Sequence, residues 1–596
     1  MTDPTAWGID AAAPPDVARA LLDAMGAEGD VPPTPPPLRF VRPGHPVPLE
    51  APADLELEDG TELVGIGSLP PDLPLGYHRL RRADGVPEHL VATPGRCHLP
   101  AGLRAWGWAV QLAATRSRAS WGIGDLGDLR RLAGWAAGRE AGVLALSPLH
   151  APAPTVPQQP SPYFASSRRF RNPLHLRVED VDGAAAAGEV VGRAAAAGRA
   201  LLADRHIDRD AVWALKREAL EACFAAAGRG ERRLGRDLEA WARWCAVAEV
   251  HGGDWRTWPA ALRVPDLRAL RSATEAVPER VAFFAWLQEQ LERQVEAVPL
   301  PVVHDLAVGF DPGGFDAWDW QGSLALDARI GAPPDEFNRA GQDWGLPPFI
   351  PWRLRALAYG PLISTLRAVL HGAGGLRVDH VMGLFRLYCV PPGGGPADGA
   401  YVRYPASDLL DVLALESARA GAVVVGEDLG TVEAGVREEL AARDVLSMRV
   451  LWFEDEPPEA WPERALGLVT THDLPTVSGV WTGSDLEDQR SAGVPAHEEG
   501  AAGLRRRLAE RTGLPEDAPV ADVVVAAHRS LAGAPSALVA ATLEDALQVP
   551  ERPNMPGTTD SWPNWSLALP VPLEDLEEDP VVEAVAGVLL QGRQRG

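Results

Sequence analysis

Residues 422–429 read AVVVGEDL, an unbroken run of small and branched apolar residues that ends in two acids. Such runs are typical of strands in a parallel sheet that helices cover on both faces. Seven further runs follow residue 100, with helical patterns between most of them: WGWAVQLA (106–113), GVLALS (142–147), VPLPVVHDL (298–306), GLRVDH (375–380), MRVLWF (448–453), LGLVTTHD (466–473) and SALVAATLED (536–545). Eight such units predict an α/β fold, a (β/α)8 TIM barrel, and leave a doubly wound open sheet as the alternative.

The barrel is expected to occupy residues 101–596, with one large interruption. The segment 148–297 is too long for a single crossover, and it contains amphipathic stretches such as AVWALKREALEACFAAAG (211–228) and RVAFFAWLQEQLERQVEA (280–297). Apolar residues at helical spacing predict helices there. We therefore expect a mostly helical insertion on the rim of the barrel.

Residues 1–100 have a different pattern from the rest of the chain. A predicted helix from Pro15 to Met25 precedes a proline-rich run at 31–49. Four short alternating stretches follow between turn residues: LELEDG (55–60), ELVGIGSL (62–69), GYHRLRR (76–82) and EHLVATPG (88–95). These are strand and hairpin signals, and they predict a small N-terminal β-rich domain.

The composition excludes several classes of partner. The chain has 596 residues, of which 46% are hydrophobic, and a net charge of −26. This charge repels phosphate backbones and anionic lipids, so we expect neither nucleic acid nor a membrane surface as a partner. The four cysteines are far apart, and the N-terminus lacks a basic stretch followed by an apolar one. Both features predict a cytoplasmic protein with no disulfide framework and no secretory signal.

Several predicted strands end in an acid or a histidine. Asp305 ends the third run, Asp379 and His380 the fourth, Glu427 and Asp428 the fifth, and His472 and Asp473 the seventh. The carboxyl ends of barrel strands open onto one face, where active sites are built. Helix capping explains a single case of this kind but not four. We expect Asp379, Glu427 and Asp473 to meet at this face, and Asp305 to serve a structural role.

Three acids without a cysteine–histidine metal pattern or a phosphate-binding glycine loop favour glycosidic bond chemistry. A retaining mechanism requires a carboxylate nucleophile and a protonated acid about 5–5.5 Å apart. Arg377 precedes Asp379 by two residues, so on a strand both side chains point the same way and the cation favours an ionised nucleophile. Glu427 requires a raised pKa, which a cleft shared with other carboxylates provides.

The sequence resembles the 4-α-glucanotransferases known as amylomaltase or disproportionating enzyme, and in particular the longer bacterial members with an N-terminal extension. The similarity runs in consistent order over about residues 101–570 through these stretches: SWGIGDLGDL (120–129), SPYFASSRRF (161–170), GAPPDEFNRAGQDWGLPP (331–348), GLRVDHVMGLFRLY (375–388), GAYVRYP (399–405), VVGEDLGTV (424–432), TTHDLPTVSGVW (470–481) and NMPGT (554–558).

The resemblance implies roles for individual residues. Asp379 matches the nucleophile, Glu427 the general acid/base and Asp473 the transition-state stabiliser. The residues implied to bind substrate are Arg377 and His380 beside the nucleophile, His472 at the bound glucose, Gln342, Trp344 and Asp335 on the loop over the acceptor, Ser161 and Tyr163 near the donor, and Asn554 and Pro556 on the rim. Packing or capping remains the alternative for isolated cases such as His472, Trp344 and Tyr163.

These expectations describe a retaining transglycosylase. It transfers segments of an α-1,4-glucan donor to the 4-hydroxyl of glucose or a maltooligosaccharide, and it needs no metal or other cofactor. An amylase-type hydrolase that uses the same acids is one alternative. A non-catalytic glucan-binding protein is the other, and the intact acids speak against it.

Overall fold

The structure is a computed structural model, and it describes residues 3–82, 85, 87–228, 234–334 and 340–594. The contacts within the chain divide it into two compact units. The first unit consists of Met1–Pro100, Val308–Pro312 and Asp316–Ser447, and the second of Ala101–Ala307, Gly313–Phe315 and Met448–Gly596. Both units are therefore assembled from segments that lie far apart in the sequence.

Eight parallel strands form a closed barrel, so the (β/α)8 fold is confirmed and the open sheet is excluded. The order around the barrel is β10-β13-β16-β17-β18-β19-β6-β7. Each strand overlaps one of the eight predicted runs; the bounds are β6 (Ala105–Val110), β7 (Val143–Leu146), β10 (Val302–Leu306), β13 (Gly375–Val378), β16 (Val423–Gly426), β17 (Leu446–Val450), β18 (Ala465–Leu468) and β19 (Leu538–Thr542).

The strands are short and almost entirely buried. In the first unit, β13 pairs with β16, which in turn pairs with the start of β17. In the second unit, β18 pairs with β19, β19 with β6, β6 with β7, and β7 with β10. Every residue of β16 and of β19 is buried, as the absence of polar alternation in these runs predicts.

The segment predicted as a helical insertion contains a short antiparallel pair and a group of helices. The pair is β8 (His150–Ala151) with β9 (Ser167–Arg171). The helices are α3 (Gly188–Ala200), α4 (Arg209–Ala227), α5 (Arg236–His251), α6 (Ala260–Arg263), α7 (Leu267–Ala273) and α8 (Pro278–Glu296). Trp241 of α5 stacks on Phe170 of β9 with ring centroids 4.9 Å apart, and on Trp244 of the same helix at 5.8 Å.

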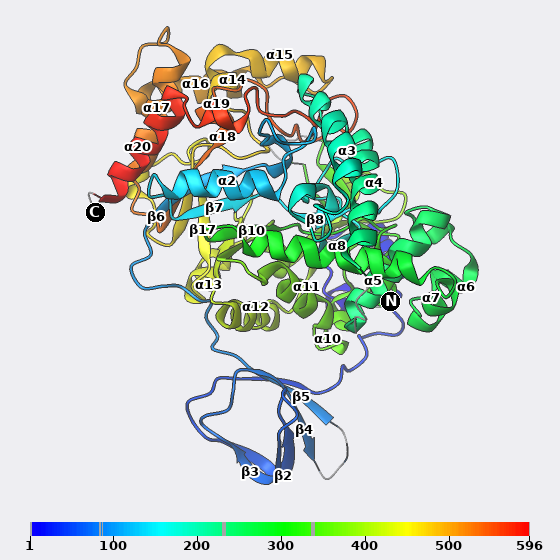
Figure 1. Cartoon of the computed structure of the whole chain (residues 1–596). Coiled ribbons are helices and arrows are strands. Elements are labelled where there is room, and N and C mark those ends of the chain that lie inside the picture. Colours follow the sequence, from blue (N-terminus) through cyan, green and yellow to red (C-terminus); the bar gives the residue numbers. More distant parts are fainter. Residues whose placement is uncertain (1–2, 83–84, 86, 229–233, 335–339, 595–596) are drawn as a thin grey trace. The chain divides into compact units, whose positions relative to one another are not determined.

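The other helices of the second unit follow its barrel strands or lie between them. They are α2 (Leu126–Ala137), α14 (Val477–Thr482), α15 (Ser484–Ser491), α16 (Glu498–Thr512), α17 (Val520–Ala532), α18 (Leu543–Ala546), α19 (Leu573–Leu576) and α20 (Pro580–Gln594). Helices α17 and α20 lie side by side (Figure 1).

The N-terminal part of the first unit contains a five-stranded sheet, drawn in blue in Figure 1. The order is β1-β5-β4-β2-β3, with bounds β1 (Leu38–Val41), β2 (Val47–Glu56), β3 (Glu62–Leu69), β4 (Gly76–Arg82) and β5 (Pro87–Ala92). The predicted helix at Pro15 is confirmed as α1 (Pro15–Ala24). Strand β1 was not expected inside the proline-rich run; it is an edge strand that pairs only with β5, a place that tolerates flanking prolines.

A second sheet of the first unit has the order β12-β11-β14-β15. Its strands are β11 (Arg329–Ala332), β12 (Gln342–Leu346), β14 (Arg386–Val390) and β15 (Ala400–Arg403). The remaining helices are α9 (Phe315–Trp320), α10 (Pro351–Ala356), α11 (Gly360–Leu370), α12 (Ala406–Ala420) and α13 (Val436–Ala442). Among the described residues, we find no helix with both the length and the apolar character that crossing a membrane requires.

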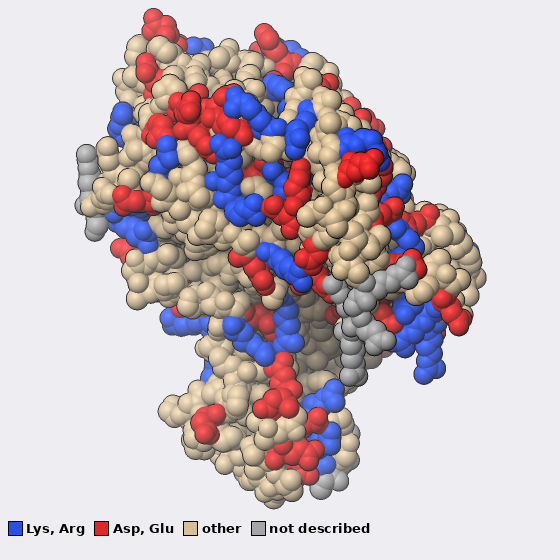
Figure 2. Space-filling model, viewed as in Figure 1, with Lys and Arg blue, Asp and Glu red and all other residues tan. Residues whose placement is uncertain are grey.

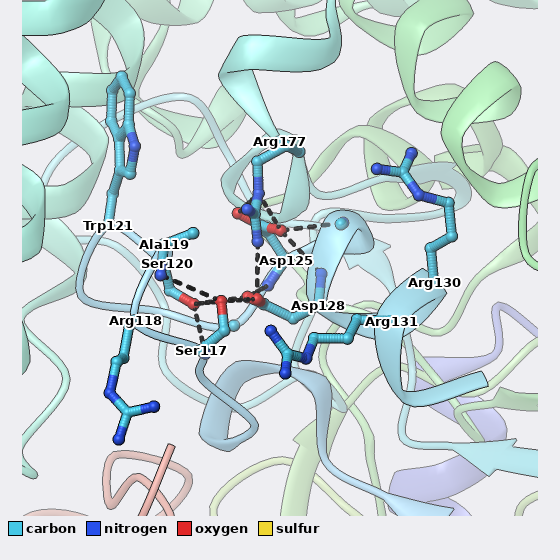
Figure 3. A network of polar contacts seen from close by, with 12 residues as sticks. Ser117, Arg118, Ala119, Ser120, Trp121, Asp125, Asp128, Arg130, Arg131 and Arg177 are labelled. Carbon is cyan, nitrogen blue, oxygen red and sulfur yellow. Dashed lines mark hydrogen bonds and ion pairs between the residues drawn. The ribbon is translucent and has the colours of Figure 1, made fainter. Parts of the chain in front are cut away.

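The motif SWGIGDLGDL forms the start of α2 through a buried polar network (Figure 3). The Asp125 carboxylate accepts the backbone N–H of Asp128, and the Asp128 carboxylate accepts the backbone N–H of Asp125, which is a capping box. Arg177 lies between the two carboxylates, 2.8 Å from Asp125 and 2.6 Å from Asp128. Ser120 donates to Asp128 at 2.7 Å. Burying two carboxylates costs desolvation free energy, and these hydrogen-bond and ion-pair partners offset that cost.

Candidate active site

Asp379 and Glu427 follow directly after neighbouring strands of the first unit. Val378 at the end of β13 is in register with Gly426 at the end of β16. The next residues, Asp379 and Glu427, therefore leave the sheet at the same level, and adjacent strands are about 4.8 Å apart. The structure places these two predicted residues next to each other, although they lie far apart in the sequence.

The backbone at His380 is shaped to hold Glu427. His380 has φ +47°, in the left-handed region that a residue with a side chain adopts at a cost of about 1–2 kcal/mol. In this conformation its N–H donates to Glu427 Oε2 at 2.9 Å, and Leu429 N–H donates to Oε1 at 2.7 Å. Both carboxyl oxygens are thus oriented by the backbone, and strain of this kind is characteristic of functional sites.

The two acids have different electrostatic environments. Burial, partly offset by Arg377 and reinforced by the negative charge of Asp379, raises the pKa of Glu427 to about 7. Asp379 instead has a cation beside it, with Arg377 Nη1 3.0 Å from its Oδ1. A carboxyl that holds its proton near neutral pH next to an ion-paired carboxylate is the arrangement that separates an acid from a nucleophile.

Gln342 and Trp344 lie on β12, an edge strand of the second sheet in the same unit. Trp344 donates from Nε1 to Gln342 Oε1 at 3.0 Å, and its ring meets His380 edge-on at 5.3 Å. The predicted loop over the acceptor is therefore a strand where these two residues stand. Asp335 lies outside the described residues.

In the second unit, His472 and Asp473 follow β18 in a tightly held loop. Asn554 donates from Nδ2 to Asp473 Oδ1 at 2.7 Å, and its backbone N–H donates to His472 O at 3.1 Å. His472 Nε2 lies 3.3 Å from Asp473 Oδ2. The structure thus brings three of the predicted residues together, and Pro556 is half-buried in the turn after Asn554.

Aromatic rings pack against one another next to this loop. Tyr163 stacks on His472 at 5.2 Å between ring centroids, and Trp565 lies 5.3 Å from Tyr163 and 5.1 Å from His472. Tyr163 also donates to Asp305 at 2.6 Å, so this acid orients the phenol. Ser161 and Trp565 line a pocket of the same unit together with His150, His175 and Arg209.

Several residues of this region were missed in the sequence. Trp565 stands in a run, WPNW, whose only signal is its aromatic content, and it has a left-handed backbone with φ +61°. Glu544 and Asp545 follow β19, and burial raises the pKa of both carboxyls to about 7. The sequence pattern could have identified these two acids, because they end the eighth predicted strand just as Asp379 and Glu427 stand at the ends of earlier ones.

The described residues contain no group of three or more histidine, cysteine, aspartate or glutamate side chains that fits a metal ion. The candidate residues of the two units offer carboxyls together with arginine, histidine, amide and aromatic groups. Such a set suits a neutral polyhydroxyl substrate, whose rings stack on aromatic faces and whose hydroxyls bond to charged groups.

Comparison with known proteins agrees with this chemistry. The family model described as 4-alpha-glucanotransferase (glycoside hydrolase 77) matches residues 110–573. The 4-alpha-glucanotransferase of Mycobacterium tuberculosis strain H37Rv is 41% identical over 616 residues, covering 89% of this chain and 85% of that protein. That of Haemophilus influenzae is 32% identical over 88% of this chain and 85% of its own length.

A solved structure supports the same assignment. The crystal structure of amylomaltase from Corynebacterium glutamicum matches with a TM-score of 0.84 and 30% identity, and the match covers 98% of each chain. The chain therefore belongs to the 4-alpha-glucanotransferase family and is a transferase that acts on α-glucans.

Proposed function

We propose that the enzyme transfers segments of α-1,4-glucan to the 4-hydroxyl of glucose or of another maltooligosaccharide by a retaining double displacement. The observation that carries the proposal is the contrast between two adjacent carboxyls. Glu427 is half-buried with its pKa raised to about 7, whereas Asp379 is paired with Arg377. This contrast supports an acid and a nucleophile on one glycosidic bond.

In the first step, an Asp379 oxygen attacks the anomeric carbon. The bond from that carbon to the glycosidic oxygen breaks, and Glu427 gives its proton to the departing oxygen. In the second step Glu427, now ionised, takes the proton of an acceptor hydroxyl as this oxygen displaces Asp379. Two inversions return the original α configuration, and no cofactor takes part.

The remaining residues act on charge and position. Arg377 pairs with Asp379 at 3.0 Å, and His380 orients Glu427 through its backbone N–H. Asp473 stabilises the positive charge that develops on the sugar ring, and Asn554 and His472 hold its carboxylate. Tyr163, Trp565 and Ser161 contact the donor sugar, and Pro556 belongs to the same rim segment as Asn554.

Preference for a sugar over water comes from acceptor binding. Gln342 and Trp344 provide an amide and an aromatic face on β12, and Asp335 belongs to the same stretch of sequence. An acceptor stacked there supplies binding energy that a water molecule lacks.

Maltotriose as the sole substrate tests the proposal. We expect glucose together with a ladder of maltodextrins longer than maltotriose. Glucose and maltose without longer chains would identify a hydrolase, and no turnover with retained binding would identify a glucan-binding protein. Asp379→Asn should abolish the ladder, by at least about 10³-fold, and still bind maltotriose in calorimetry. Normal turnover by this variant would remove Asp379 from the mechanism.

We further propose that residues 1–100 form an extension distinct from the catalytic region at 101–596, and that the enzyme works in the cytoplasm. All four cysteines are unpaired and buried, which suits a reducing compartment. Cell fractionation tests the location, and limited proteolysis around residue 100 tests the boundary.

A further inference from the structure

Residues 8–10 form an additional edge on the sheet that carries Trp344. Residues Pro4–Trp7 make a 3-10 turn capped by Asp3, and Gly8 turns the chain with φ +85°. Ile9 then forms an antiparallel bridge with Val402 of β15. The five-stranded N-terminal sheet takes no part in this contact, which is made by the segment that precedes it.

The contact is made by backbone hydrogen bonds. Arg403 N–H donates to Gly8 O at 2.8 Å, and Asp10 N–H donates to Tyr401 O at 2.9 Å. These bonds satisfy the groups of β15 that face away from β14, its partner on the other side. A strand edge without such bonds would depend on water.

Side chains fix the same segment. Trp7 is only 2% exposed, and its ring packs edge-on against Trp352 of α10 with centroids 4.7 Å apart. Ile9 is also 2% exposed. Burying two large apolar side chains stabilises the folded position of this segment, so the segment is a packed part of the unit.

The sheet connects this edge to Trp344. Tyr401 of β15 is in register with Tyr388 of β14, Tyr388 with Gly331 of β11, and Gly331 with Asp343 of β12. Asp343 stands between Gln342 and Trp344 in the sequence. A Cβ added at Gly331 would lie 2.0 Å from Gln342 O, so these two strands approach each other too closely for any side chain at 331.

We propose that residues 8–10 are a positioning strand for the acceptor site: they complete the edge of the β12-β11-β14-β15 sheet and thereby hold Trp344 against His380. This inference rests on the proposed role of Trp344 in acceptor binding. The segment touches no reacting atom. Its effect is on where the acceptor sugar lies, and not on the attack by Asp379.

Gly8→Val tests the inference, with Gly60→Val as its matched control. Both glycines have a left-handed backbone, with φ +85° and +86°. A Cβ at Gly8 meets Arg403 O at 3.0 Å, whereas a Cβ at Gly60 meets nothing within 4 Å. The two variants thus share the backbone strain, and only the side chain at position 8 comes into close steric contact with β15. If Gly8→Val does not fold, Gly8→Ala and Gly60→Ala replace the pair.

The full-length enzyme is assayed with α-maltotriosyl fluoride as donor and glucose as acceptor. We expect Gly8→Val to raise the KM for glucose about five-fold or more and to leave the initial burst of fluoride within about two-fold of the unaltered enzyme. Gly60→Val should leave both within about two-fold. A merely structural role of the segment would reduce the amount of active enzyme, and so lower the initial burst of fluoride without changing the KM for glucose.

A double-mutant cycle with Trp344→Ala tests the route. If the segment acts through Trp344, Gly8→Val adds less than about two-fold to the glucose KM in that background. An additive effect, an equal effect of Gly60→Val, or an unchanged KM in Gly8→Val overturns the inference. Absence of glucose-dependent transfer by the unaltered enzyme would instead overturn the proposed function itself.

Discussion

At the scale of single residues, the surroundings of Asp379 and Glu427 decide what each carboxyl can do. Asp379 has Arg377 at 3.0 Å, whereas Glu427 is half-buried and accepts hydrogen bonds from two backbone N–H groups. The backbone bonds favour the ionised form, and burial outweighs them, so the pKa of Glu427 rises to about 7. The identity of the two side chains alone would not distinguish an acid from a nucleophile.

The pH dependence of donor cleavage follows from this pKa. Glu427 must carry a proton in the first step, so kcat/KM for the donor should fall as the pH rises through about 7. Glu427→Gln should lower the rate by about 10²–10⁴-fold and remove this basic limb from the pH profile. Stopped-flow release of fluoride from α-maltotriosyl fluoride measures both. A basic limb that survives in Glu427→Gln would assign it to another group.

The same shift affects stability. The pKa of Glu427 is higher in the folded chain than its usual 4.5, so folding is favoured below that value and loses this contribution as the pH rises through about 7. Glu427→Gln should therefore be more stable than the unaltered protein at pH 8, by up to about 3 kcal/mol, with the difference vanishing below about pH 4.5. Urea unfolding at pH 5 and pH 8 measures this, and a variant that is less stable at pH 8 would contradict the shift.

At the scale of elements, buried polar groups fix the ends of helices near the barrel. Arg177 ties both acids at the start of α2, and Thr476 ties the loop after β18 to the segment after β19. Asp545 accepts the N–H of Val477 at 2.8 Å at the start of α14. The loop that carries His472 and Asp473 is thus fixed by hydrogen bonds at its C-terminal end to residues that follow β19.

Arg177→Met should destabilise the second unit strongly. It removes the cation that contacts both buried acids and leaves Asp125 with Lys216 at 3.7 Å, and breaking a buried pair in this way costs about 3–5 kcal/mol. Arg130→Ala is the control, because its ion pair with Asp180 is exposed and contributes about 0–1 kcal/mol. Figure 3 shows both arginines around the same helix. Equal losses in urea unfolding would refute the role of the network.

Thr476→Val tests the hold on the catalytic loop. Thr476 accepts from Gly479 N–H at 3.0 Å and donates to Val549 O at 2.7 Å, and valine keeps the shape without either bond. We expect a loss of about 1–2 kcal/mol in stability and a lower kcat for donor cleavage. Thr482→Val, at the exposed end of α14, is the control and should change neither. An unaltered kcat in Thr476→Val would show that the position of Asp473 does not depend on Thr476.

At the scale of the whole molecule, charge is abundant and mixed. The net charge is −26, yet acidic and basic side chains are interspersed on the face drawn in Figure 2. Many of them form exposed ion pairs, such as Arg131 with Glu577 at 2.6 Å and Arg118 with Asp575 at 2.6 Å. An acidic field keeps copies of the chain apart and leaves a neutral glucan unaffected.

Transfer between neutral sugars should therefore be insensitive to salt. We expect kcat/KM for maltotriose to stay within about two-fold between about 0.02 M NaCl, where screening is weak, and about 0.5 M NaCl, where it is strong. The substrate carries no charge on which the field of the protein could act. Initial rates of glucose release measure this. A steep fall with salt would indicate that a charged group of the substrate or a salt-sensitive closure limits the rate.

Local patterns were sufficient for much of the architecture. The runs around β16 and β19 predict buried strands from composition alone, and Asp379 and Glu427 are found directly after strands as expected. The pattern failed at β1, where prolines in the flanks concealed a strand that only pairing with β5 reveals. Trp565 was also missed, since an aromatic residue in a loop has the same local pattern whether it packs or binds.

The sequence by itself determined the eight apolar runs, the acids at their ends and the family, because these depend on residue type and order along the chain. Only the tertiary structure decided that Glu427 lies half-buried beside Asp379 with a raised pKa, that Trp565 joins Tyr163 and His472, and that residues 8–10 complete a sheet edge. The physical reason is that desolvation, ring packing and strand pairing depend on groups contributed by distant segments, which no local pattern specifies.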